Sequence, residues 1–62
     1  MREGFKTVQD CIHDYLRPYK FLDKSCLNII DDNKEVIISL IGSNKYTRYM
    51  KSSSNNKYYR IN

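Results

Sequence analysis

The residues that could perform acid–base or nucleophilic chemistry lie close together in the first quarter of the chain. His13, the only histidine, stands among Asp10, Cys11 and Asp14. A cysteine beside a histidine could form a nucleophile and base, with a carboxylate to orient the imidazole. On a helix, however, residues two apart point in different directions, so Cys11 and His13 cannot pair within one helix. We therefore interpret His13 as an exposed histidine that the neighbouring carboxylates stabilise.

The other candidates for catalysis or metal binding are weaker still. Asp31 and Asp32 are adjacent carboxylates, but they lie at a predicted turn, where aspartate is favoured for bonds to its own backbone. Cys11 and Cys26 are the only cysteines, and neither falls in a zinc-ligand spacing. The sequence therefore predicts a protein that is not an enzyme, with no catalytic residues, no cofactor and no metal.

The strongest functional signal is the uneven distribution of charge. All seven acids lie within the first 35 residues, whereas the last 18 residues carry a net charge of +5 and four of the six tyrosines. Cations contact phosphates and flat rings stack on bases, so this composition is typical of a surface that binds nucleic acid. The alternative is an ordinary solvated sheet edge. The predicted nucleic-acid-binding residues are Lys45, Arg48, Tyr49, Lys51, Lys57, Tyr58, Tyr59 and Arg60.

Apolar residues at intervals of three and four predict an amphipathic helix over about residues 5–17. The stripe begins at Phe5 and runs to Leu16 and beyond, although Thr7 with Asp10 also fits a capping box that would start the helix later. Pro18 ends the helix, because the residue before a proline is disfavoured in helical geometry.

From residue 25 the hydrophobic period changes to two, which predicts strands over about 26–31, 35–41 and 45–51. A hairpin turn at Asp32-Asn33 separates the first two strands. For the segment 57–61, a fourth strand and a disordered tail remain alternatives. We therefore expect one α+β domain over residues 1–62, an N-terminal helix packed on one face of a three- to four-stranded antiparallel β-meander. The predicted helix-facing residues are Leu27, Ile29, Val36, Ile38 and Leu40.

The third strand could enter the sheet in two registers, which place opposite sets of side chains on the helix side. A two-residue loop before this strand would put Tyr49 in the core. A three-residue loop would bury Tyr46 and Met50 and would leave Tyr49 outside with Lys45 and Lys51. We favour the three-residue loop, because it gathers two lysines around an exposed tyrosine.

One short helix cannot cover both faces of a sheet, so the opposite face should expose Ile30, Ile37 and Ile41. We expect this patch to be a homodimer interface. The alternatives are a nucleic acid or partner protein on the same face, or a C-terminal segment that packs back over it.

The sequence therefore favours a non-enzymatic binding module, a homodimer that holds nucleic acid with little base specificity through its basic, tyrosine-bearing C-terminal half. DNA and RNA are not distinguished. The rival hypothesis is a small inhibitor or adaptor, such as a phage might encode, that blocks a larger host protein through its open sheet face or a sheet edge. With no secretion signal and no apolar run of membrane-spanning length, we expect a cytoplasmic protein that does not contact membranes.

Overall fold

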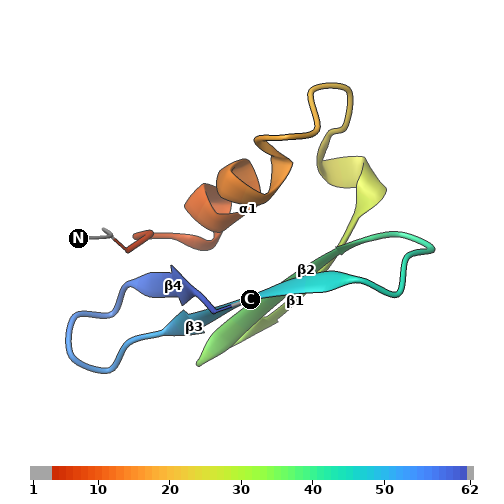
Figure 1. Ribbon diagram of the computed structural model, residues 1–62. Helices are drawn as coiled ribbons and strands as arrows, with labels where there is room; N and C mark the ends of the chain where they lie inside the picture. The colour runs from red at the N-terminus through yellow and green to blue at the C-terminus, as the bar shows by residue number, and fades with distance from the viewer. Residues whose placement is uncertain (1–3, 62) are drawn as a thin grey trace.

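The computed structural model describes residues 4–61, which form a helix layer and a sheet layer. Helix α1 (Val8–Leu16) and the short 3-10 helix η1 (Lys24–Cys26) precede four strands, β1 (Leu27–Asp32), β2 (Glu35–Leu40), β3 (Tyr46–Lys51) and β4 (Tyr58–Arg60). The strands form one antiparallel sheet in the order β1-β2-β3-β4, and α1 lies over one face (Figure 1). The predicted α+β architecture is confirmed, and the 57–61 segment contains a strand.

Helix α1 begins three residues later than the predicted start at residue 5. Thr7 caps the helix, because its side-chain hydroxyl accepts a hydrogen bond of 3.2 Å from the backbone N–H of Asp10. At the other end the helix stops at Leu16, close to the predicted end, and Arg17 is its C-cap residue; Arg17 keeps helical dihedral angles (φ −51°, ψ −46°), so Pro18 has not forced it into an extended conformation. The capping signal thus locates the first turn better than the apolar stripe does.

Phe5 lies outside the helix because it pairs with the sheet. Its backbone N–H and C=O both bond to Tyr58 at 2.8 Å, which places the segment before α1 along the outer edge of β4 (Figure 1). Gly4 makes this approach possible. A Cβ atom at Gly4 would lie only 2.6 Å from the Cβ atom of Lys57 and 2.8 Å from the ring of Tyr59.

The turn between β1 and β2 is formed by Asn33 and Lys34, not by the predicted Asp32-Asn33. Asp32 pairs with Glu35 as the last residue of β1, and its carboxylate accepts a 2.7 Å bond from the N–H of Asn33. The register is therefore shifted by two positions. A shift of two leaves each side chain on its predicted face, since strand side chains alternate with a period of two.

Strand β3 turns inward the face that we did not favour, and residues 41–45, not a two-residue loop, join it to β2. Tyr49 pairs with Val36 and lies under α1, so Arg48 and Met50 lie on the opposite face with Tyr46. The favoured register was wrong because it would have turned Tyr49 outward, away from Asp14 of α1, and Arg48 inward, away from Glu35. The observed register instead buries the ring of Tyr49 completely.

Tyr49 is the centre of the core, and a carboxylate on the helix satisfies its hydroxyl group. The hydroxyl donates a 2.7 Å hydrogen bond to Oδ2 of Asp14, and the ring of Phe5 packs edge-on against Tyr49 with centroids 5.8 Å apart. Nη1 of Arg60 lies 3.9 Å from the same Asp14 oxygen. One carboxylate therefore connects α1 to both β3 and β4. The buried apolar residues around it are Cys11, Ile12, Leu27, Val36, Ile38 and Tyr58.

The substitution Tyr49→Phe should destabilise the protein by about 1–3 kcal/mol, because it removes a hydrogen bond to a largely buried carboxylate. The measurement is the free energy of unfolding from urea denaturation. Tyr19→Phe is the matched control, since it removes the hydroxyl of an exposed tyrosine and should change stability by less than about 0.5 kcal/mol. Equal stability of the two variants would contradict the role given to Asp14.

Candidate binding surface

Two of the predicted nucleic-acid-binding tyrosines lie inside the protein. Tyr49 is 0% exposed and Tyr58 is 8% exposed, and both belong to the core between α1 and the sheet. Burial raises the pKa of both hydroxyl groups, and the hydrogen bond to Asp14 raises that of Tyr49 further. Neither ring can stack on a base without opening the core.

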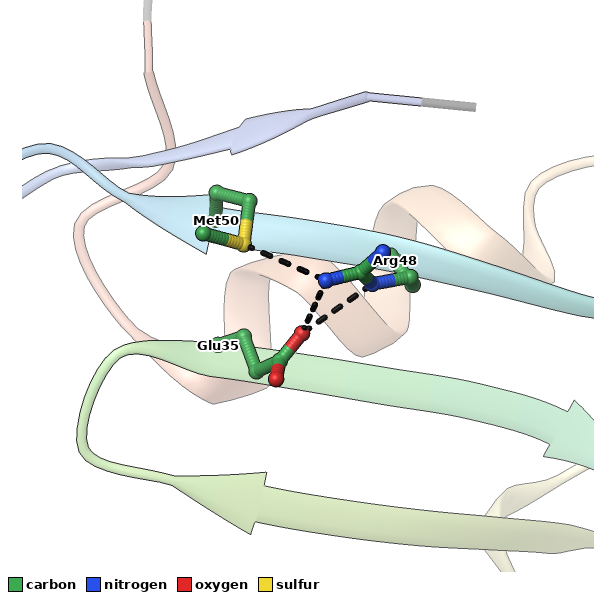
Figure 2. A network of polar contacts seen from close by, with 3 residues as sticks. All are labelled: Glu35, Arg48 and Met50. Atoms are coloured by element: carbon green, nitrogen blue, oxygen red, sulfur yellow. Dashed lines mark hydrogen bonds and ion pairs between the residues drawn. The ribbon is translucent and has the colours of Figure 1, made fainter.

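The two predicted arginines lie on opposite faces of the sheet, and each has an acid beside it. Nε and Nη2 of Arg48 donate bonds of 3.0 Å and 2.7 Å to Oε1 of Glu35, and Nη2 also lies 3.8 Å from the sulfur of Met50. Figure 2 shows this group on the side of the sheet turned away from α1. Arg60 lies on the helix side, beside Asp14. These carboxylates offset much of the charge that the sequence places in the tail.

The three predicted lysines have no such partners. Within residues 4–61, neither ion pair involves Lys45, Lys51 or Lys57. Lys51 lies with its ammonium 5.8 Å from the ring centroid of Tyr58, which is a cation–π distance. Lys57 lies beside Tyr59 where the chain passes Gly4, and Lys45 is exposed just before β3. No ion pair therefore offsets the charge of these lysines, but the three are distributed along the sheet.

The register assigns a consistent set of side chains to the face opposite α1, which we call the open face. Its β3 and β4 half carries Tyr46, Arg48, Met50 and Tyr59. Tyr46 is 52% exposed, and Tyr59 is half-buried and accepts a 3.0 Å bond from the side-chain amide of Asn55. A guanidinium group held by Glu35 thus shares this half of the face with two tyrosine rings. Sequence reasoning missed Tyr46 because its position depends on the register of β3.

The β1 and β2 half of the open face carries one apolar pair between two polar pairs, Asn28 with Ser39 and Asp32 with Glu35. Ile30 pairs directly with Ile37, and Ile30 is 53% exposed, while Ile37 is half-buried. Ile41 follows the end of β2 and is 68% exposed. The structure therefore brings Ile30 and Ile37 together, with Ile41 beyond the strand.

Cys11 and His13, the residues first considered for catalysis, both belong to α1 but lie on different sides of it. Cys11 is completely buried, whereas His13 is exposed and its Nε2 lies 3.3 Å from the amide nitrogen of Gln9. Within residues 4–61, no three His, Cys, Asp or Glu side chains come together as metal ligands would. In the same part of the chain, no helix has the length and apolar character needed to cross a bilayer.

Comparison of the chain with models of protein families, with curated proteins and with solved structures found no significant match.

The buried thiol of Cys11 should make the protein sensitive to alkali. Burial, followed by the charges of Asp10 and Asp14, raises its pKa from 9.0 to about 11. The unfolded thiol ionises more readily, so the stability that this group contributes is fully present below pH 9.0 and is lost as the pH rises toward about 11. Urea denaturation across this range should therefore show falling stability, with a shallower fall in Cys11→Ala. Cys26→Ala, which keeps the buried thiol, should retain the original pH dependence; identical profiles for all three proteins would contradict this assignment.

Proposed function

We propose that this protein is a non-enzymatic module that holds single-stranded nucleic acid on the β3 and β4 half of its open face. The observation that carries the proposal is the grouping of Tyr46, Arg48 and Tyr59 on one accessible side of a sheet. Exposed aromatic rings on a sheet accept unpaired bases by stacking, which needs no particular base. This half of the face therefore suits a single strand better than a duplex, whose bases are already stacked.

Arg48 has a specific part in this proposal. Because Glu35 offsets its charge, Arg48 adds little to the attraction of phosphate, but the two hydrogen bonds hold its guanidinium plane in a defined orientation (Figure 2). A planar guanidinium of this kind can stack on a base as an aromatic ring does. The attraction of phosphate comes instead from Lys45 and Lys57, at the margins of the β3 and β4 half of the open face.

The binding test uses fluorescence anisotropy of a labelled single-stranded oligonucleotide. With about two phosphates neutralised, the logarithm of the affinity should fall against the logarithm of salt concentration with a slope of about −1.4. The variant Tyr46→Ala should bind about tenfold more weakly, because stacking contributes on the order of 1–3 kcal/mol per base. Tyr19→Ala, which removes an exposed ring of the segment after α1, is the control and should bind normally.

Undetectable binding at low salt would refute the proposal, and so would equal affinity of Tyr46→Ala and the unmodified protein. Oligonucleotides of matched sequence in DNA and RNA form then decide which nucleic acid the module prefers.

A second candidate function uses the isoleucine pair on the β1 and β2 half of the same face. The directly paired Ile30 and Ile37 favour contact with another protein surface, either a second copy of the chain or the target of a small inhibitor. The two proposals are compatible, because the isoleucines lie on β1 and β2 and the tyrosines on β3 and β4.

If two copies associate through Ile30 and Ile37, Ile30→Asp should convert the dimer into a monomer, because it places a charge in the interface. Light scattering coupled to size-exclusion chromatography measures the mass. Phe21→Asp is the matched control: Phe21 is 99% exposed but lies in the segment that joins α1 to η1, away from the open face (Figure 1). A dimer that survives Ile30→Asp, or that dissociates with Phe21→Asp, would rule out this interface.

A further inference from the structure

A shallow hollow lies at one end of the sheet, between the turn that joins β1 to β2 and the loop that joins β3 to β4. Its volume is about 410 Å³, within the range of about 300–1,000 Å³ that is typical of small-molecule sites. The residues that line it are Asn33, Lys34, Met50, Lys51, Ser52, Ser53 and Asn56. None of these seven residues is acidic.

Backbone hydrogen bonds fix the position of the two lysines. The N–H of Lys51 donates a 2.8 Å bond to the carbonyl of Lys34, which joins the turn to the end of β3. The serine-rich loop is closed in the same way, because the N–H of Asn56 donates a 2.9 Å bond to the carbonyl of Ser52. Asn56 has a φ of +61°, a left-handed conformation that asparagine tolerates better than most residues. These bonds fix the backbone on both sides of the hollow, from which the side chains of Lys34 and Lys51 extend.

The charge of this hollow is not neutralised within the described residues. Neither ion pair in residues 4–61 involves Lys34 or Lys51. Of the two acids that flank the turn, Glu35 is paired with Arg48, and Asp32 accepts the N–H of Asn33 but forms no ion pair with a lysine of the hollow. The ammonium group of Lys51 lies 5.8 Å from the ring centroid of Tyr58, a contact that leaves its positive charge uncancelled.

The neutral side chains of the hollow provide suitable hydrogen-bond donors. Among the described residues, the hydroxyl of Ser53 and the amide of Asn56 form no hydrogen bond, in contrast to Ser52 and Ser54, whose hydroxyls lie 2.9 Å apart and bond to each other. Lysine binds phosphate as a point charge, and hydroxyl and amide groups donate to its remaining oxygens. We infer that this hollow is a binding site for a phosphate group, with Lys34 and Lys51 as its cationic residues.

This inference does not require that the open face bind nucleic acid, but Met50 connects the two sites. Met50 lines the hollow and also belongs to the open face, where it pairs with Tyr59. The phosphate group could therefore belong either to a strand on the open face or to a free phosphorylated compound. The chemistry of recognition is the same for both, and the experiment separates them.

The first measurement is a titration of the ¹⁵N-labelled protein with inorganic phosphate at constant ionic strength, followed through the amide resonances of Ser53 and Asn56. We expect saturable shifts, and we expect Lys34→Gln or Lys51→Gln to weaken the affinity about tenfold, because each removes a charged hydrogen-bond donor. Lys20→Gln removes the same charge from the segment after α1 and should have no effect. Shifts that do not saturate, or an unchanged affinity in both hollow variants, would overturn the inference.

The second measurement compares oligonucleotides with and without a 5′-phosphate. If the strand supplies the phosphate, the phosphorylated oligonucleotide binds more tightly and Lys34→Gln removes the difference. If inorganic phosphate binds saturably, the two oligonucleotides bind equally well and Lys34→Gln leaves both affinities unchanged, the site serves a free phosphorylated compound. Tyr46→Ala separates the two proposals, because it should weaken binding of the strand and leave the phosphate titration unchanged.

Discussion

The hydrogen bond between Tyr49 and Asp14 is the interaction on which the arrangement of this domain depends. A small domain buries little surface, so each large core side chain carries a substantial share of its stability. Tyr49 is the largest completely buried side chain, and its hydroxyl could not be buried without an acceptor. Asp14 supplies that acceptor from α1 and lies near Arg60 of β4. The same bond selects the face of β3 that turns inward, and it thereby determines which tyrosines remain outside.

The periodicity of the chain was enough to predict the elements of the fold, because helices and strands bury apolar residues at different intervals. Even a wrong turn at Asp32-Asn33 left the inward face of β1 and β2 correct, since the error was an even number of residues. The predicted helix start was wrong because Phe5 fits the apolar stripe of α1 but lies outside the helix. It packs against Tyr49 and pairs with β4, and both contacts are distant in sequence.

The candidate site was harder to predict, because it depends on whether the odd-numbered or the even-numbered residues of β3 face α1. Composition identified the basic, tyrosine-rich tail, but it could not assign Tyr46 or Tyr49 to a face without the register of β3. Nor could it indicate that Glu35 would reach Arg48 across the strands, or that Lys34 would join Lys51 at one end of the sheet. These are long-range contacts, and a pattern read along the chain contains no direct information about them.

The pairing of Phe5 with Tyr58 also limits how copies of this chain can associate. A sheet with two open edges can add strands at both and grow into a fibre. Here the backbone of Phe5 occupies the outer edge at Tyr58, while β1 forms the opposite margin of the sheet. Edge-to-edge addition is thereby directed to β1, and two copies joined antiparallel through that strand would use up each other's exposed margin. A further copy that added to the other margin would first have to displace the bridge between Phe5 and Tyr58.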